Sequence, residues 1–377
     1  MDFSWTDQQQ AVYDRVLAGA RALGAHTAPV PDPVRGLWRG CAELGLTGLS
    51  VPEEWGGRGY DAVTTARAVE AAGRGCPDMG LLFSVLAHLF ATAMPIVEHG
   101  DDTLRKELVP PLAAGARIGA NAITEEAAGS DVTALRTTAE RHGDHYALNG
   151  TKTFVSNAPI ADLLLVYAVT DPAFGFLGVT CFAVDRDTPG VTIGAPFDKP
   201  ALTTCPAATV TFTDAVVPTT RVVGRPGQGA AIFQSSMRWE RSCLFAAYLG
   251  QMDRLIDETV QHASTRQQFG RPLAANQAVS HRIAEMKLRL ETARLLLYRT
   301  CWLLDRDEHT PLDIALAKLH TAESAVQTAL DATQLFAGSA HSTRTDIERA
   351  LRDALPARTF SGTSDIQREL IAKGLGL

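Results

Sequence analysis

The sequence predicts an α+β protein, mostly α, in which a β-rich segment separates two helical regions. Apolar residues recur at helical spacing in the first ~118 residues and again from Ala230 onward. Between them, from Gly119 to about Arg225, alternating β-branched runs are separated by turn signals. Because helices and strands are segregated along the chain, this order favours separate α and β layers. We therefore expect an N-terminal helical domain at 1–118, a middle β-domain at 119–226 and a C-terminal helical bundle at 227–377.

The N-terminal region contains two segments, Asp7–Ala22 and Val34–Leu46, with apolar residues at helical spacing. The polar start MDFSWTDQQQ already begins a helix, so we do not expect a signal peptide. The most apolar segment, Gly80–Val97, is nearly long enough to cross a membrane. Polar residues and a proline interrupt it and no basic flank anchors it. This favours a helix buried inside a large protein, with membrane insertion as the minor alternative.

The middle region contains five candidate strand runs: HYALNGTKTFVS, ADLLLVYAVT, GVTCFAVD, GVTIGAP and AATVTFTDAVVP. Asn149-Gly150, inside the first of them, is a strong hairpin signal and predicts a turn there. The sequence GRPGQG at Gly224–Gly229 lacks the spacing of a dinucleotide-binding loop and no βαβ unit surrounds it, so we interpret it as a flexible domain connection. After it, long helical runs follow at Val279–Asp305 and Pro311–Phe336.

Composition excludes several classes of function. The net charge is −7 with no cluster of basic residues, so we expect neither nucleic acid nor an anionic membrane as a partner. The six cysteines are scattered without a C-x-x-C pair, which indicates reduced thiols in a cytoplasmic protein. The sequence has no H-E-x-x-H, no G-x-S-x-G and only isolated histidines. Hydrolase and metalloenzyme functions are therefore unsupported, and we expect no metal site.

Five short segments occur in an order that is specific as a set: AITEEAAGSD at Ala122–Asp131, KTFVSN at Lys152–Asn157, STRQQFGRPLAANQ at Ser264–Gln277, QLFAGSA at Gln334–Ala340 and GTS at Gly362–Ser364. The first is a small-residue turn whose backbone amides and hydroxyls suit a phosphate or a polar ring edge. Together the segments resemble the acyl-CoA dehydrogenase flavoprotein family over essentially the full chain. The resemblance implies a helical domain, a β-barrel-like middle domain and a four-helix bundle, with FAD between them.

The resemblance also implies which residues hold the cofactor. The isoalloxazine and ribityl part would be surrounded by Thr124, Gly129, Ser130, Phe154, Ser156 and Thr363. The adenine and pyrophosphate end would be held across the subunit interface of a homotetramer by Arg266, Phe269, Gln277, Gln334 and Gly338. The family commonly has Trp at the position of Phe154 and glycines at those of Ala337 and Ala340. Phe still offers a flat apolar face, so we expect FAD binding to be retained.

The position of the catalytic base departs from the family's usual pattern. The family commonly carries a glutamate immediately before the Gly-Thr, where this chain has Ser361, and a hydroxyl without a general base cannot deprotonate carbon. Glu240 instead lies on the apolar stripe of the expected helix Ala230–Met252, where burial would raise its pKa. The pattern alone slightly favours the alternative, a structural salt bridge to Arg238 or Arg241, because buried ion pairs also occur in ordinary cores.

The resemblance decides between these two readings. Acyl-CoA dehydrogenases of the isovaleryl type carry their base on this helix in a Glu-Arg pair, which matches Glu240-Arg241. It therefore implies that Glu240 is the catalytic base. Since Ser361 is compact, it suits a substrate ring, and we expect Ser361 and Arg241 to contact the substrate.

Four further stretches narrow the resemblance: SNAPIAD, GFLGV, SSMRWERSCL and RTFSGTSDIQRELIAKGLGL. They are similar to the L-prolyl-[peptidyl carrier protein] dehydrogenases, which form pyrroles by oxidising a prolyl thioester on a carrier protein's phosphopantetheine arm. A short branched-chain acyl-CoA is the alternative substrate. A flavin monooxygenase on the same fold and a non-catalytic partner subunit are alternatives of a different class. An electron-transfer flavoprotein and oxygen both remain open as electron acceptor.

Overall fold

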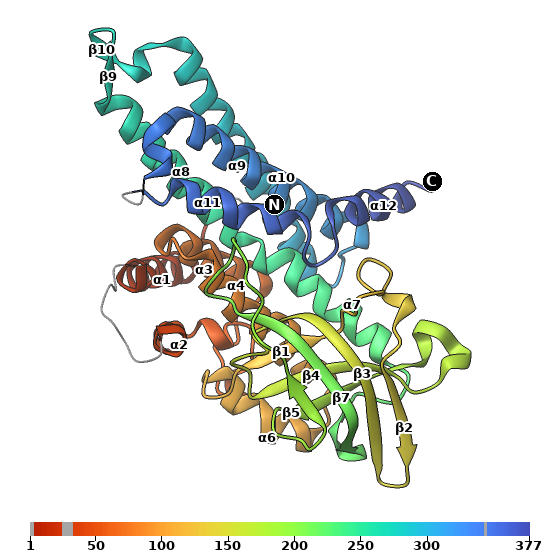
Figure 1. The fold of residues 1–377 in the computed structure, drawn as a ribbon. Helices are drawn as coiled ribbons and strands as arrows, with labels where there is room; N and C mark the ends of the chain where they lie inside the picture. Colours follow the sequence, from red (N-terminus) through yellow and green to blue (C-terminus); the bar gives the residue numbers. More distant parts are fainter. Residues whose placement is uncertain (1–3, 25–32, 343–344) are drawn as a thin grey trace.

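The computed structural model describes residues 4–24, 33–342 and 345–377, and its elements follow the expected order of helices, sheet and helices (Figure 1). The N-terminal part contains α1 (Asp7–Gly24), α2 (Pro33–Glu43), α3 (Ala62–Gly75), α4 (Met79–His88), a π-helical turn (Leu89–Ala93), α5 (Met94–His99) and α6 (Asp102–Ala113). Asp61, Asp78 and Asp101 precede α3, α4 and α6, and each accepts a hydrogen bond from a backbone N–H of the first helical turn. These caps fix where the helices begin.

The segment Met79–His99 is the one described helix that is long and apolar enough to cross a membrane by length and composition. It runs through α4, the π-helical turn and α5, and 83% of its apolar window is buried inside the protein. Such burial is typical of the core helix of a globular protein. His88 shows why its polar residues are tolerated there. Its Nδ1 accepts from Gly119 N at 2.8 Å while Nε2 lies 3.0 Å from Leu112 O, and burial lowers the pKa of His88 to about 4.

The middle part is an eight-stranded sheet in the order β6-β7-β3-β2-β4-β5-β8, with β1 paired to β4. Its strands are β1 (Gly119–Ala122), β2 (Thr138–His142), β3 (His145–Ser156), β4 (Leu163–Val169), β5 (Val179–Asp185), β6 (Val191–Ile193), β7 (Ala207–Pro218) and β8 (Val222–Val223). Strand β4 is buried on both faces, and alternate residues enter different cores. Leu163, Leu165 and Tyr167 join the core shared with the helices, whereas Leu164, Val166 and Ala168 join a second core enclosed by the sheet.

The expected hairpin at Asn149-Gly150 is wrong. Both residues lie inside β3, which continues from His145 to Ser156, and the chain reverses before it, at the Gly143-Asp144 turn between β2 and β3. Asn149-Gly150 forms a bulge, where the register of β3 against β7 shifts. The Asn149 side chain exchanges hydrogen bonds with Asp214 on β7. Gly150 has φ +145, a conformation that favours glycine, so Asn-Gly serves a bulge here rather than a turn.

The C-terminal part is a helical bundle that extends away from the sheet (Figure 1). It contains α7 (Gly229–Trp239), a π-helical turn (Glu240–Leu244), α8 (Ala246–Thr265), the hairpin β9 (Gln267–Gln268) and β10 (Arg271–Pro272), α9 (Gln277–Leu304), α10 (Pro311–Phe336), α11 (Ile347–Ala354) and α12 (Ser364–Gly374). Short 3₁₀ turns lie at Leu46–Gly48, Glu53–Trp55, Val132–Ala134, Pro172–Gly178, Thr219–Arg221, Leu273–Ala275, Ala337–His341 and Leu355–Arg358. The expected helix Ala230–Met252 is thus interrupted by a π-helical turn that begins at Glu240.

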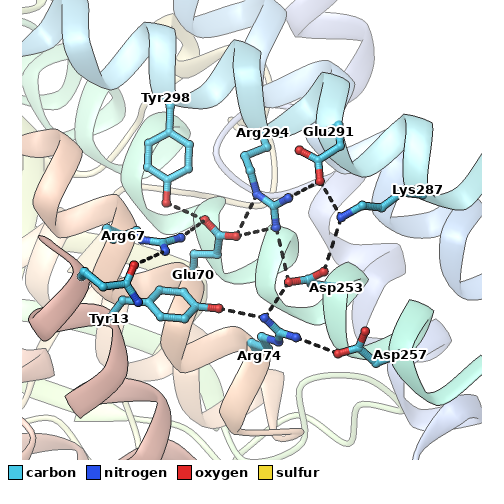
Figure 2. Close-up of polar contacts among 11 residues, drawn as sticks. Tyr13, Arg67, Glu70, Arg74, Asp253, Asp257, Lys287, Glu291, Arg294 and Tyr298 are labelled. Carbon is cyan, nitrogen blue, oxygen red and sulfur yellow. Dashed lines mark hydrogen bonds and ion pairs between the residues drawn. The ribbon is translucent and has the colours of Figure 1, made fainter. Parts of the chain in front are cut away.

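An ion-pair network joins the N-terminal helices α1 and α3 to α8 and α9 of the bundle (Figure 2). At its centre Glu70 is 1% exposed and accepts hydrogen bonds from Arg294 Nη2 at 2.7 Å and from the Tyr298 hydroxyl at 2.5 Å. Arg294 also pairs with Asp253, which in turn pairs with Arg74 on α3. Because each charge in the centre has an opposite neighbour, the network stabilises the contact between the two helical regions.

Replacing Glu70 by Gln is expected to destabilise the protein by about 3 kcal/mol, because Arg294 and Arg67 would lose their buried carboxylate. The measurement is the thermal unfolding midpoint at a fixed protein concentration. Asp257→Asn is the matched control: its side chain is 62% exposed and bonds Arg74 at 2.7 Å, so we expect a loss of about 0.5 kcal/mol or less. Equal effects of the two variants would contradict a central role for Glu70.

Candidate active site

A cleft of about 690 Å³ opens where the three parts of the chain meet. The N-terminal helices contribute Phe83, Ala87 and Ala91, and the β-domain contributes Thr124, Gly129, Ser130, Phe154 and Ser156. The bundle contributes Met237, Glu240, Arg241, Ser361 and Thr363. The structure thus brings together all the residues expected around the isoalloxazine and the substrate. This volume lies in the range of small-molecule sites.

Glu240 enters the cleft from the point where α7 changes into the π-helical turn. It follows Met237 on the stripe that faces the cleft, and both residues line it. π-Helical turns of this kind insert an extra residue into the helical repeat and are frequent at functional sites. Only 6% of Glu240 is exposed. The turn therefore places a carboxylate where an apolar side chain is expected.

The Glu240 carboxylate has one hydrogen-bond donor and one unpartnered oxygen. Ser361 Oγ donates to Oε2 at 2.7 Å, and Oε1 has no partner among the residues that the structure describes. Burial raises the pKa of Glu240 from 4.5 to about 7, while the Ser361 hydrogen bond and the Arg241 charge oppose that rise. A carboxylate with a pKa near neutrality and a free oxygen on a cleft can accept a proton from a bound molecule.

Among the described residues, neither Arg238 nor Arg241 forms the structural salt bridge to Glu240 that the sequence left open. Arg238 pairs with Glu98 at 2.8 Å, and Trp239 Nε1 donates to the same carboxylate at 2.7 Å. Arg241 Nε donates to the backbone carbonyl of Ser361 at 2.8 Å. Both arginines therefore bind other acceptors, and Glu240 has no direct ion pair with a described residue.

The Ser361–Gly362 turn has a strained backbone. Ser361 has φ +53 and Gly362 has φ +87, and Thr363 then caps α12 by accepting from Ile366 N at 3.2 Å. Glycine adopts such angles freely, whereas a residue with a Cβ loses about 1–2 kcal/mol. This turn directs the Ser361 hydroxyl at Glu240.

The turn Ala122–Asp131 is fixed from behind by a buried ion pair. Lys152 Nζ donates to Glu125 Oε1 at 2.7 Å and to Ile123 O at 3.1 Å. The Glu125 carboxylate also accepts from the backbone N–H groups of Arg136 and Thr137. This arrangement presents Thr124, Gly129 and Ser130 to the cleft. Apart from its two chain neighbours, no described residue lies within 4 Å of a Cβ built on Gly129, so this backbone is open to a bound molecule.

Phe154 offers a flat apolar face to the cleft. It is 68% exposed with φ +51, and its ring lies 5.1 Å from that of Phe197. An exposed aromatic ring held in a left-handed conformation is unusual in a strand. The conformation fits a residue that packs against a planar ligand, as we expect for this position.

The residues expected at the adenine end lie elsewhere. Arg266, Phe269, Gln277, Gln334 and Gly338 are not among the described residues that line the cleft. Arg266, Phe269 and Gln277 surround the β9–β10 hairpin at the far end of the bundle (Figure 1). Gln334 and Gly338 flank the end of α10, where Phe336 stacks on His262 of α8 at 4.2 Å. None of these residues lines the cleft in the described part of the chain, so their contact with the cofactor across a subunit interface remains a proposal.

Ala337, which replaces a family glycine, has φ +50 and ψ −132. Alanine carries in this position a conformation that glycine would adopt without strain. Its neighbour Ala340, the other replaced glycine, is fully buried. Ala337 thus adopts a strained backbone conformation, and the methyl group of Ala340 is buried.

Sequence reasoning missed several residues of the site. Phe83 and Phe360 form an aromatic wall with ring centroids 4.6 Å apart, and Lys199 also lines the cleft. The fully buried Lys318 on α10 donates to Gly362 O at 2.8 Å. A signal for Lys318 was present, because it shares the buried helical face of Ile314, Ala322 and Ala325. No group of metal-ligating side chains occurs in the described part of the chain.

The Glu240→Gln variant tests the burial of this carboxylate. A group whose pKa rises on folding stabilises the protein below its unfolded-state pKa and loses that contribution as pH rises through the folded-state pKa. The window for Glu240 is therefore about pH 4.5 to 7. We expect Glu240→Gln to gain stability relative to the parent protein between pH 5 and pH 8, by on the order of 3 kcal/mol. Thermal unfolding at both pH values measures this, with the partly exposed Glu348→Gln as control. A stability difference between Glu240→Gln and the parent protein that does not change with pH would contradict the raised pKa of Glu240.

Comparisons with known proteins place this geometry in a family. The chain matches the family models described as acyl-CoA dehydrogenase N-terminal domain at residues 7–116, middle domain at 120–215 and C-terminal domain at 227–376. It is similar to an L-prolyl-[peptidyl-carrier protein] dehydrogenase of Pseudomonas fluorescens, with 50% identity over 381 residues and 100% of both chains covered. A protein of the same name from a Serratia species is 43% identical, with 100% of this chain and 99% of the relative covered.

A solved structure described as PigA with FAD and proline has the same fold. Its TM-score is 0.95 at 40% identity, and the match covers 100% of both chains. The resemblance of the ordered sequence motifs and the expected fold class are thus confirmed over the full length. The chain belongs to the acyl-CoA dehydrogenase family.

Proposed function

We propose that this protein is an FAD-dependent dehydrogenase of a thioester, and that its substrate is an L-prolyl group on a peptidyl carrier protein. The observation that carries the proposal is Glu240, a buried carboxylate that faces the cleft and forms no ion pair with any residue that the structure describes. The two full-length relatives named for this activity support the choice of substrate. The product would be a pyrrolyl-2-carboxyl thioester, formed by two successive two-electron oxidations.

FAD fits the residues that line the cleft. Phe154 presents an exposed ring, Gly129 leaves its backbone open, and the hydroxyls of Thr124, Ser130, Ser156 and Thr363 surround the same space. Flat apolar faces and hydroxyls are the groups that an isoalloxazine and a ribityl chain require. When bound, FAD would supply hydride acceptance from the substrate's β-carbon. The remaining chemistry is that of the chain itself.

Glu240 would remove the proton from the carbon next to the thioester carbonyl. A pKa of about 7 makes it a stronger base than an ordinary carboxylate while it remains partly ionised at neutral pH. Its unpartnered Oε1 is the atom that would accept the proton, since Oε2 is bonded to Ser361. Arg241 contributes positive charge beside the base, which favours the negative charge that develops on the substrate. Phe83, Phe360 and Met237 line the cleft with apolar surface that excludes water.

The choice of substrate has one alternative that an observation favours. A base on this helix is also the arrangement of the isovaleryl type, so a short branched-chain acyl-CoA is the second candidate. The two alternatives of a different class have less support. A flavin monooxygenase or a non-catalytic subunit would not need a buried base with a free oxygen, which the cleft retains.

We further propose a homotetramer in the cytoplasm. Apolar residues are exposed on the bundle: Phe269 is 100% exposed, Leu288 60%, Leu295 54% and Leu330 44%. Exposed apolar patches of this kind favour association. Pairing of bundles would also bring the residues of the β9–β10 hairpin to the cofactor of a neighbouring subunit. All six cysteines are described as free and buried thiols, as expected for a reducing compartment.

The decisive experiment offers the purified, FAD-loaded protein either prolyl-carrier protein or isovaleryl-CoA. We expect loss of four hydrogens from the prolyl thioester by mass spectrometry and no flavin bleaching with the CoA ester. Bleaching with the CoA ester alone would instead support the second candidate. An oxygen-dependent hydroxylated product would indicate a monooxygenase. Running the reaction with and without oxygen and an electron-transfer flavoprotein identifies the acceptor.

Glu240→Gln should give a folded, yellow protein whose rate of flavin reduction falls by a factor of about 10² to 10⁴, because proton transfer loses its acceptor. Flavin absorbance and circular dichroism report cofactor binding and folding independently of activity. Unchanged turnover would remove Glu240 from the mechanism.

A further inference from the structure

The side-chain amino group of Lys318 is buried beside the active site, and no carboxylate in the described part of the chain pairs with it. The residue is 0% exposed, and its Nζ donates to the backbone carbonyl of Gly362 at 2.8 Å. The ring of Phe245 lies 5.3 Å away. Among the described residues, the acid whose charge reaches it is Glu323, which is committed to Arg358 and Ser364. Burial lowers the pKa of Lys318 to about 7, and the hydrogen bond to Gly362 O offsets part of the cost of burying this group.

That contact holds the strained turn next to the base. Three donors fix the two carbonyls of the turn: Arg241 Nε bonds Ser361 O at 2.8 Å, Lys318 bonds Gly362 O at 2.8 Å, and Gln367 Nε2 bonds Gly362 O at 3.1 Å. They come from the π-helical turn, from α10 and from α12 respectively. Strained backbone conformations persist when the surrounding contacts over-determine them.

The Ser361–Gly362 turn also fixes the Ser361 hydroxyl, which contacts Glu240. Ser361 has φ +53, and in this conformation its Oγ lies 2.7 Å from Glu240 Oε2. A turn that relaxed to an extended backbone would move the Cβ of Ser361 and break this bond. A hydrogen bond donated to a carboxylate favours its ionised form, so the turn influences how readily Glu240 ionises.

We propose that Lys318 is a positioning residue for the base: by holding the Gly362 carbonyl, it keeps Ser361 in the conformation whose hydroxyl donates to Glu240. This inference rests on the proposed role of Glu240. Ser361 thereby gains a function as the hydrogen-bond partner of the base, beyond the space that it leaves for substrate.

Among the described residues, few titratable or charged groups lie near Glu240 or Lys318. Glu240 is approached by Arg241 on its own π-helical turn and by the Tyr167 hydroxyl from β4. Lys318 is approached by Arg241 from the π-helical turn and by Glu323 on its own helix. From α12, the neutral Gln367 contacts the turn. Since Arg241 contacts the same turn, it is left unchanged in the test.

The test compares Lys318→Met, Ser361→Ala and the double variant in the FAD-loaded protein. The pKa of Glu240 is measured without substrate, from the infrared carbonyl band that Glu240→Gln removes. The pH dependence of flavin reduction by prolyl-carrier protein is measured beside it. We expect each single variant to raise the Glu240 pKa by about one unit, which lowers the rate at pH 6 by about tenfold and leaves it nearly unchanged at pH 9. The double variant should show no larger shift than either single one.

Lys318→Arg should restore both measurements, because an arginine can still donate to Gly362 O. Lys287→Met is the matched control: it removes a half-exposed ammonium that pairs with Glu291 on α9, and it should change neither measurement. A Lys318→Met protein that loses stability but keeps the parental Glu240 pKa would overturn the proposal, and so would additive shifts in the double variant.

If Lys318→Met folds poorly, the comparison moves to the Ser361→Gly background, where glycine removes the backbone strain. There the loss of Lys318 should leave the Glu240 pKa unchanged, and a shift would overturn the proposal. These measurements distinguish a failure of the proposed role of Glu240 from a failure of the proposed role of Lys318. Turnover by Glu240→Gln would reject Glu240 as the base, while the infrared shifts would still decide whether Lys318 positions Ser361.

Discussion

The burial of a single carboxylate, that of Glu240, is the constraint on which the rest of the site depends. A nearby arginine would relieve the cost of burial but would also lower the pKa and weaken the base. The structure limits this effect by giving each neighbouring arginine another acceptor, so that the Arg241 charge only partly opposes the rise in the pKa of Glu240. Arg238 is drawn to Glu98, and Arg241 to the carbonyl of Ser361. What remains for Glu240 is one hydroxyl donor and one free oxygen, which is the minimum that keeps a buried carboxylate reactive.

The three parts of the chain are joined by polar contacts at the edges of the cleft. His88 fixes the start of β1, the Glu125–Lys152 pair fixes the turn Ala122–Asp131, and Asp353 on α11 accepts from Leu202 N at 2.7 Å. Burial raises the pKa of Asp353 to about 6. The His88 and Asp353 contacts each pair a side chain with the backbone of another region, whereas the Glu125–Lys152 pair joins two side chains of the middle part. The positions of the site residues therefore follow from how the three regions dock, more than from any one region alone.

Much of this arrangement was predictable from the sequence, and the failures have physical causes. Composition and periodicity gave the order of helices and strands, and the apolar stripe around Glu240 identified the residue that does not fit it. The Asn149-Gly150 hairpin was wrong because the same dipeptide also suits a bulge, and only the partner strand with Asp214 distinguishes the two. The π-helical turn at Glu240 has no sequence signature, since it depends on how α7 and α8 pack. Lys318 carried the same signal as Glu240, a charge on a buried face. The contact of Phe269 and Gln334 with the adenine end of FAD stays a prediction, because it is expected at an interface with a second subunit.

Strand β4 sends alternate residues into two cores, and the larger core contains side chains from the N-terminal, middle and C-terminal parts. The domain boundaries predicted from the sequence, near residues 118 and 226, therefore do not separate parts that would unfold independently. A fragment cut near residue 118 or 226 would expose one face of β4 to water, and the enclosed core of the sheet is small by comparison. The walls of the cleft come from all three parts of the chain, so the cleft is complete only where this common core has closed.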